Sequence, residues 1–467
     1  MLSTVLADVA EPVGRKLVET AIAVTGGRLQ GDAVREQLEL PGRYGGMAMR
    51  LIAEGRVADA TFWAAWSTMR QAVPDLAQRL GLGPVACAGQ EEAAAARDRL
   101  LEAGVQVDEL GGVSFTEQAA AEYAAGPWAK DVPADLLGKV PQWLDVRPTQ
   151  PAPPLGSEPS RVPMRVASRV YKHLEALRAH RLWSKLPAWR QEALLSAGGP
   201  GGGSLWTQMP VDERGFFPTS HFRMASLRRL GLIDVPEGAT CAIPPTTSGG
   251  AEEEVCGHLL DRHFTHPQLC GKGPAKLRAH TALASSLARQ LRDCRADVDM
   301  ERVVPELMQE HRQGNRAEYL EAILDIVATW PGQVRPAWID VTVRCPHAER
   351  YPVAHSRPGH AAAVAEQSKL ERYGPGVFPV AFETYGRIGD RSRESLQVLA
   401  LLAGAYVGDQ WALPRLVPQW TAQLQRAVLF AVADVDLLAL GARVGSLAIA
   451  MRRACDAAGG AAHVQTG

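Results

Sequence analysis

The sequence has few cysteines and almost no net charge. Its seven cysteines among 467 residues are sparse and odd in number, and no charged amino-terminal segment runs into a signal-peptide apolar core, so an intracellular, reducing setting is expected. Lys and Arg total 50 against 51 Asp and Glu, a net charge of −1. Binding to a polyanion would therefore depend on local patches, because the whole chain produces no field of one sign.

Long uninterrupted apolar runs are also missing. The most apolar stretch, residues 427–451, contains Asp434, Asp436 and Arg443, and each of these charges is costly inside a bilayer. We expect a packed helix pair there and no membrane span.

The length and composition predict several globular parts joined by long loops. A chain of 467 residues with 46% hydrophobic residues, 44 Gly and 32 Pro should build at least two cores. Helical hydrophobic spacing begins at Val5 and Val9, and six prolines between Pro141 and Pro159 favour an extended linker. The predicted parts are a helical region (1–140), a Pro-rich linker (141–162), a basic helical linker (163–237), a zinc-knuckle-like segment (238–285), a catalytic core (286–390) and C-terminal helices (391–467).

One local patch is strongly basic. Residues 161–190 contain eight Lys or Arg against one Glu, interleaved with Tyr171, Trp183 and Trp189. Cations beside aromatic rings can hold nucleic acid through phosphate contacts and base stacking, but a solvated amphipathic helix has the same pattern. The candidate nucleic-acid-binding residues of this patch are Arg169, Lys172, Arg181 and Lys185.

A second cluster gathers metal-ligand residue types. Between Cys241 and His280 lie three of the seven Cys and four of the twelve His. Zinc prefers four tetrahedral Cys and His ligands, and the predicted set is Cys241, Cys256, His266 and Cys270, with His258 and His263 as rivals. Fourteen residues separate the first two Cys, where a knuckle usually has two to four, so an inserted loop is required.

Farther along, two acids and a lysine follow one another at suggestive spacing. Residues 321–343 read as two β-branched runs around a Trp-Pro-Gly turn, a hairpin pattern, with Asp325 in one run and Asp340 in the other. A helix over 361–374 carries Lys369, and another strand is expected at 377–386. Two carboxylates can hold Mg²⁺ or Mn²⁺ and a nearby ammonium can act on the attacking water, so this layout is typical of metal-dependent phosphodiester hydrolysis.

Taken in order, these motifs resemble the C-terminal part of non-LTR retrotransposon proteins that carry a restriction-like endonuclease. LELPGRYGGMAMR (38–50) followed by FWAAW (62–66) is similar to the segment after the reverse transcriptase thumb, and GGPGGGSLWTQMP (198–210) with HFRMASLRRLGL (221–232) resembles the linker before the knuckle. CGHLLDRHFTHPQLC (256–270) resembles the second half of the CCHC knuckle, and KLRAHTAL (276–283) the helix start after it.

The resemblance implies an α+β fold with a PD-(D/E)xK restriction-endonuclease-like core in the C-terminal half, preceded by an all-α region and the zinc segment. It implies catalytic roles for Asp325, Asp340 and Lys369, with Glu306 as an upstream acid. Arg278 and His280 would contact DNA phosphates together with the basic patch, and the carbonyl of Val341 would be a further metal ligand. Two departures are the missing Pro before Asp325 and the long knuckle insertion.

Two functions follow from this pattern. The first is a Mg²⁺- or Mn²⁺-dependent endonuclease that also binds Zn²⁺ and nicks target DNA, derived from a truncated or domesticated retroelement protein. The alternative is a catalytically inactive scaffold or remnant that binds DNA or RNA through the knuckle and the basic patch. No Tyr/Phe-x-Asp-Asp motif occurs, so polymerase activity is not expected. A nuclease acting on chromosomal DNA would work in the nucleus.

Overall fold

The computed structural model describes the chain as two compact units, residues 1–187 and 188–467. The described residues are 32–47, 66, 90–108, 112–128, 162–199, 202–203, 218–244, 255–261, 263–272, 275–307, 309–313, 316–320, 322–333, 335–409 and 411–441. The predicted helix through Val5 and Val9, nearly all of the Pro-rich linker and the residues after 441 lie outside them. The division between the units falls inside the segment 163–237, because its first helix belongs to the first unit.

The first unit combines helices with a small β-hairpin. Its elements are α2 (Asp32–Glu39), the 3-10 turn η1 (Gly42–Tyr44), α4 (Gln90–Glu102), β1 (Val105–Val107), β2 (Val113–Phe115), α5 (Glu117–Ala124) and α6 (Val162–Lys185). Strands β1 and β2 pair antiparallel, and the loop between them closes where Asp108 Oδ1 accepts the N–H of Gly112 at 2.7 Å. The prediction of an all-α region was wrong here, because strands of three residues are too short to show a period-2 pattern.

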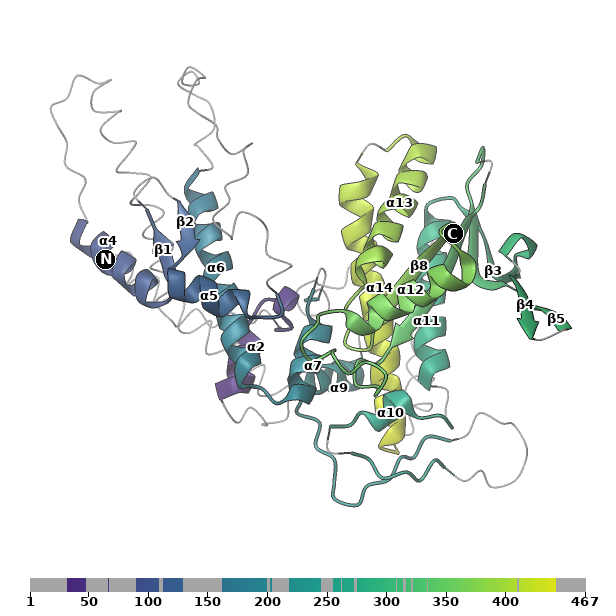
Figure 1. Ribbon diagram of the computed structural model, residues 1–467, viewed down its shortest axis with the longest axis horizontal. Coiled ribbons are helices and arrows are strands. Elements are labelled where there is room, and N and C mark those ends of the chain that lie inside the picture. Colours follow the sequence, from purple (N-terminus) through teal and green to yellow (C-terminus); the bar gives the residue numbers. More distant parts are fainter. Residues whose placement is uncertain are drawn as a thin grey trace, which may run out of the picture. The chain divides into compact units, whose positions relative to one another are not determined.

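The second unit contains a four-stranded mixed sheet with helices on both faces (Figure 1). Its elements are α7 (Ala188–Ala197), α9 (Thr219–Leu230), α10 (His266–Leu269), α11 (Ala275–Asp293), β3 (Asp297–Val303), η4 (Pro305–Leu307), β4 (Gln309–Gln313), β5 (Arg316–Leu320), β6 (Ile323–Thr329), β7 (Ala337–Arg344), α12 (His360–Tyr373), β8 (Val377–Glu383), α13 (Asp390–Val407) and α14 (Ala412–Ala439). The sheet order is β3-β6-β7-β8, with β7 and β8 parallel and the other neighbours antiparallel. This confirms the mixed α and β architecture.

Each face of the sheet has its own apolar layer. On one face α11, α13 and α14 pack against side chains such as Ile326, Ile339 and Phe382 in the largest core of the unit. On the other face α12 packs against β7 and β8, with Ala365 beside Ala381. Because side chains alternate across a strand, neighbouring residues of β7 and β8 reach different helices. The sheet is therefore covered by helices on both faces.

The predicted hairpin, helix and strand around the two acids are confirmed. Strands β6 and β7 pair through Ile326–Ile339 and Ala328–Ala337, and α12 and β8 follow within a few residues of the predicted bounds. A crossover through α12 returns the chain to a strand parallel to β7, as expected when a helix separates two strands of one sheet.

The apolar stretch near the C-terminus belongs to one long helix in its described part. Residues 427–439 complete α14, and the residues beyond 441 lie outside the described ones. Asp436 is fully buried in this helix. Among the described residues, every helix falls short of the length and apolarity that crossing a membrane requires.

Candidate functional site

Asp325 and Asp340 lie where two paired strands separate. The ladder between β6 and β7 runs from Ala328–Ala337 to Ile326–Ile339 and ends there, and its continued register would set Asp325 opposite Asp340. Like charges directly opposite each other destabilise a strand pair. Asp325 instead accepts the backbone N–H of Val341 through Oδ2 at 2.7 Å, so its side chain replaces the next backbone hydrogen bond.

Lys369 forms an ion pair with Asp340 from the helix on one face of the sheet. Its ammonium contacts Asp340 Oδ2, and both side chains are largely buried. Lys369 also lies 5.9 Å from the ring of Tyr373, one turn along α12. Thus the structure brings together three of the four predicted catalytic side chains, each from a different element.

His280 enters the same cluster from the helix on the other face. Its Nε2 lies 3.0 Å from Asp325 Oδ1, and the side chain is one third exposed. The hydrogen bond to Asp325 raises the pKa of His280 against the lowering effects of burial and of the Lys369 charge, and the charges of Asp325 and Asp340 add to the increase. His280 was predicted to contact DNA phosphates, whereas its position makes it a member of the acidic cluster.

Burial controls the protonation of Asp340. Asp340 is 3% exposed, and desolvation raises the pKa of its carboxyl from 3.8 to about 6, although Lys369 acts in the opposite direction. The charge of Asp325 adds to the increase. A cation close to a buried carboxylate stabilises the charged form of that carboxylate.

Glu306 lies at the surface of the second unit. Asp325 and Asp340 contact Lys369, His280 and the backbone of Val341, whereas the side chain of Glu306 is exposed on the turn η4. Val341 donates its N–H to Asp325, and the metal-ligand role expected of its carbonyl stays a prediction.

The donor types of the cluster suit a hard divalent cation. Mg²⁺ and Mn²⁺ accept carboxylate ligands, and two carboxylates lie here on neighbouring strands. Because Asp340 is buried, its charged form would be more stable with a cation beside it than without one. In the structure, Lys369 and His280 balance the two acids.

The second candidate site is a Cys₃His cluster with zinc-like geometry. One ligand atom from each of Cys241, Cys256, His266 and Cys270 lies within 4.8 Å of all the others, close to the separation of about 4 Å expected for atoms about 2.0–2.3 Å from one shared zinc. Among the described residues this is the set whose geometry could hold a metal ion, and it is the set predicted from the sequence.

Backbone pairing explains how Cys241 and Cys256 meet despite the fourteen residues between them. Cys241 N–H donates to His258 O at 2.8 Å, and Cys256 N–H donates to Ile243 O at 2.9 Å. The chain segments on either side of the insertion therefore run side by side and hold the two thiols across from each other. Residues 245–254 of the insertion lie outside the described residues.

The chemistry of this cluster also fits zinc. Burial raises the pKa of the Cys241 thiol to about 12, and the nearby Cys270 and Cys256 add to the increase. Three thiols this close cannot all ionise without a cation, and zinc supplies that charge. Of the rival ligands, His258 stacks on the ring of the cluster residue His266, and His263 packs against the ring of Trp189.

The carboxylate of Asp261 orders the turn that carries His266. It accepts the backbone N–H of His263 at 2.9 Å, of His266 at 2.9 Å and of Thr265 at 3.0 Å. Burial alone would raise the pKa of Asp261, but these donors hold it below its ordinary value. The start of α10, and with it the His266 ring, is positioned by this side chain.

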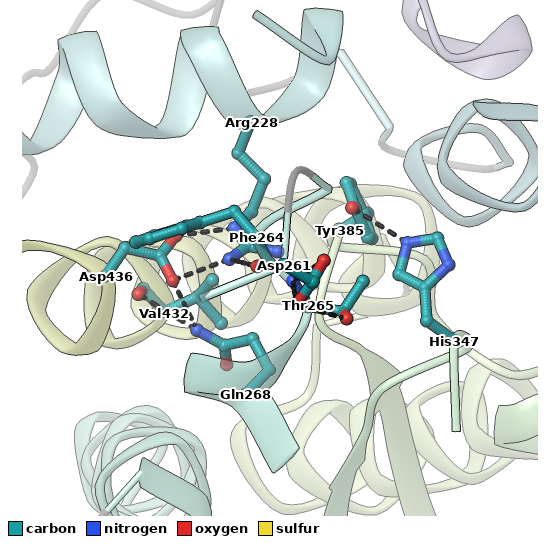
Figure 2. Close-up of polar contacts among 9 residues, drawn as sticks. All are labelled: Arg228, Asp261, Phe264, Thr265, Gln268, His347, Tyr385, Val432 and Asp436. Atoms are coloured by element: carbon teal, nitrogen blue, oxygen red, sulfur yellow. Dashed lines mark hydrogen bonds and ion pairs between the residues drawn. The ribbon is translucent and has the colours of Figure 1, made fainter. Parts of the chain in front are cut away.

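A buried ion pair joins the zinc segment to the large helices (Figure 2). Arg228 of α9 binds Asp436 of α14, with Nη2 2.6 Å from Oδ1, and also donates to Phe264 O at 2.9 Å. Gln268 of α10 donates to the same Asp436 oxygen at 2.8 Å. Beside this network Cys241, Cys270 and Phe264 pack against Val435 and Ala439 of α14. The segment is therefore part of the core of the second unit.

Figure 2 also shows a second polar chain near Arg228. His347 Nε2 lies 2.9 Å from the hydroxyl of Tyr385, and its Nδ1 lies 2.5 Å from Glu192 of α7. The guanidinium of Arg228 lies 5.6 Å from the centre of the Tyr385 ring. These contacts tie α7 and the end of β8 to α9.

Much of the predicted basic patch is neutralised within the first unit. Arg181 of α6 forms two hydrogen bonds with Glu122, at 2.9 and 3.0 Å, and Lys185 lies 3.5 Å from Glu36. Arg169 and Lys172 are partly buried on the same helix. In the second unit Arg278 forms an ion pair with Asp434. Ion pairing with carboxylates leaves less of this charge for phosphates.

Sequence reasoning missed two buried glutamates that fix the helices beside the site. Glu383, at the end of β8, accepts the N–H of Ala361 at 3.0 Å and caps α12, which carries Lys369. Glu366 of α12 accepts the N–H of Ser392 at 2.7 Å and caps α13. Nothing in a strand or helix pattern marks an acid that caps a neighbouring element.

Comparisons with known proteins give no match: no family model, no curated protein and no solved structure resembles this chain. Its function is therefore inferred from the geometry of its own residues.

Proposed function

We propose that the chain is a metal-dependent DNA endonuclease of the PD-(D/E)xK restriction-like type that nicks target DNA. The observation that supports this proposal is the meeting of Asp325, Asp340 and Lys369 where β6 and β7 separate. These residues were chosen from the sequence on chemical grounds, and they lie on two strands and a helix. We include in this proposal a retroelement origin and action in the nucleus.

Each of the three residues would have its own role in phosphodiester hydrolysis. Asp325 and Asp340 would hold the cation, and Lys369 would orient the attacking water or offset charge on the phosphate. A bound Mg²⁺ or Mn²⁺ would polarise the phosphate and lower the pKa of a water molecule. The buried, ion-paired setting of Asp340 keeps that carboxylate in one position before substrate arrives.

The direct test is nicking of supercoiled plasmid with Mg²⁺ or Mn²⁺. We expect the wild-type protein to convert supercoiled into open-circular DNA, and Asp340→Asn to abolish the reaction. Lys369→Met should slow it by about 100-fold or more, the usual size of a lost proton-transfer or orienting group. Asp299→Asn serves as the matched control, because Asp299 is an exposed acid of the same sheet paired with Arg302. Nicking that survives Asp340→Asn, or that is missing from all proteins, contradicts the proposal.

The alternative function is a catalytically inactive scaffold that binds DNA or RNA. The ion pairs of Arg181 and Lys185 weaken its predicted binding surface. Gel-shift binding that weakens steeply with salt, from a protein that does not nick, would favour the scaffold.

A further inference from the structure

The end of α11 carries a row of exposed arginines. Residues 277–295 contain four Arg and a single acid, Asp293. Arg289, Arg292 and Arg295 recur every three residues and are exposed, so they follow one side of the helix end. Leu287 lies on the other side and is fully buried in the core under the sheet. We call these three residues the arginine row.

The charge of the arginine row is not neutralised by a carboxylate in the part of the chain that the structure describes. Arg278, earlier on the same helix, differs because it forms an ion pair with Asp434. Arg292 donates instead through Nη2 to the backbone carbonyl of Val298 at 3.0 Å. This contact holds the guanidinium in place and leaves its charge uncompensated. The row therefore presents positive charge to solvent.

The backbone of Arg295 has a conformation that favours glycine. Its φ is 66°. The N–H of Ala296 donates to Leu291 O at 3.1 Å, and the N–H of Arg295 donates to Arg292 O at 2.9 Å, so α11 ends in a Schellman motif with Arg295 at the position after the cap. Glycine is usual there because it has no Cβ. A side chain kept at a strained position is a reason to look for a function.

A row of unneutralised cations suits the phosphates of nucleic acid, because each Lys or Arg that meets a phosphate releases bound counterions. Along the helix axis Arg289 and Arg295 lie about 9 Å apart at 1.5 Å per residue, the axial length of about three base pairs. Resting on the nuclease proposal above, which makes DNA the substrate, we propose that Arg289, Arg292 and Arg295 bind the phosphate backbone of duplex DNA.

The position of the arginine row determines which step it serves. His280, near the start of α11, lies 3.0 Å from Asp325, so that end of the helix adjoins the acidic cluster. The row lies at the other end, about 18 Å along the axis from His280 to Arg292, and on the solvent side. DNA held there flanks the cut site. Loss of the row should therefore weaken DNA binding and leave the cleavage rate of bound DNA unchanged.

Two competing interpretations give the same composition. The row could be a solvated helix face without a partner, or a docking surface for an acidic protein. Neither predicts that the affinity for DNA, and its dependence on salt, change when the arginines are replaced. A DNA-binding measurement therefore separates them from the proposal.

The experiment measures binding of the full-length, zinc-loaded protein to a fluorescent 30-base-pair duplex by anisotropy at several salt concentrations, without Mg²⁺ or Mn²⁺. We expect the double variant Arg289→Gln, Arg292→Gln to weaken binding about tenfold or more at low salt. The slope of log affinity against log salt should fall by about 1.8, or 0.9 for each lost phosphate contact. The matched control is Arg391→Gln with Arg393→Gln, two exposed arginines of α13 that stand between two acids, and it should bind as the wild type does.

Arg295→Gly separates a binding role from a structural one. Glycine fits the backbone at this position better than arginine does, so the variant should melt at the same temperature as the wild type or higher. The salt slope should nevertheless fall by about 0.9. Unchanged DNA binding in this variant would contradict the proposal for Arg295.

The outcomes distinguish this inference from the nuclease proposal. If the wild type does not bind the duplex, or if the double variant keeps its affinity and salt slope, the arginine row is not a DNA surface, whatever the plasmid assay shows. If the double variant binds weakly and the wild type does not nick, the DNA surface is supported and the nuclease proposal fails. Circular dichroism and zinc content confirm that the compared proteins share one fold.

Discussion

Ionisation of the Asp340 carboxyl lowers the unfolding free energy of the protein. Burial raises its pKa from 3.8 to about 6, so the folded chain binds this proton more tightly than the unfolded chain does. The contribution of Asp340 to stability is present below pH 4 and is lost as the pH rises through 6. A difference of about two pH units corresponds to at most ~3 kcal/mol.

Asp340→Asn removes this pH dependence, because the amide does not titrate. We expect the unfolding free energy of the variant, relative to the wild type, to rise by up to ~3 kcal/mol between pH 3.5 and pH 7. Urea denaturation at several pH values, without added Mg²⁺ or Mn²⁺, measures the difference. A difference that stays constant with pH would mean that burial does not shift this carboxyl. An active-site acid that costs stability is common in enzymes.

Individual site residues were predictable where short-range sequence order sets the geometry. Asp325 and Asp340 flank one turn, so the hairpin alone brings them near each other, and the helix that must follow carries Lys369. His280 and Glu306 depend on how α11 and the turn η4 are placed in three dimensions. The helical phase of Leu283 and Leu287 could have indicated that His280 borders the buried face, but no local pattern gives its partner Asp325.

At the level of elements, α13 starts on a carboxylate supplied by α12. Glu366 accepts both the N–H and the hydroxyl of Ser392, and the Ser392 hydroxyl in turn accepts the N–H of Ala381 from β8 at 2.6 Å. Three elements around the site thus share one polar contact that is removed from water.

Glu366→Ala should lower the unfolding free energy by about 1–3 kcal/mol, because it leaves buried donors of the α13 start unsatisfied. Thermal denaturation compares it with Glu371→Ala, which removes an exposed acid of the same helix and should change stability by less than about 0.5 kcal/mol. Equal melting temperatures for the two variants would show that the cap contributes nothing.

Elements were predictable in proportion to their length and regularity. The β-branched runs of β6 and β7 and the helix α12 gave clear patterns, and their order fixed the antiparallel and parallel pairing. The hairpin of β1 and β2 was not predicted, because Val105–Val107 and Val113–Phe115 are too short to show an alternating hydrophobic pattern. The apolar and buried character of α14 was anticipated, and the remainder of the expected helix pair, residues 442–451, lies outside the described residues.

For the molecule as a whole, zinc should stabilise one unit and not the other. The cluster ligands pack on Val435 and Ala439, and the buried pair of Arg228 and Asp436 ties the same segment to α9 and α14. Structural zinc contributes directly to folding free energy. The first unit has no described residue in this cluster.

We expect Cys270→Ser to lower bound zinc from one equivalent to less than a tenth, and to lower the melting transition of residues 188–467. Elemental analysis measures the metal, and calorimetry measures the transitions of the two units, which need not unfold together. Cys294→Ser, at a cysteine outside the cluster, is the control. A variant that keeps full zinc would exclude Cys270 as a ligand, and a metal-free wild type would exclude the site.

The pairing of the segments around Cys241 and Cys256 has a practical consequence for engineering. Because the chain leaves and re-enters at neighbouring points, lengthening the connection adds only the entropy of a longer loop, about 0.6 kcal/mol for each doubling. A peptide tag or a foreign recognition module placed between residues 245 and 254 should leave the four metal-binding side chains in place. The same tolerance means that motif searches with a fixed cysteine spacing pass over sites of this kind.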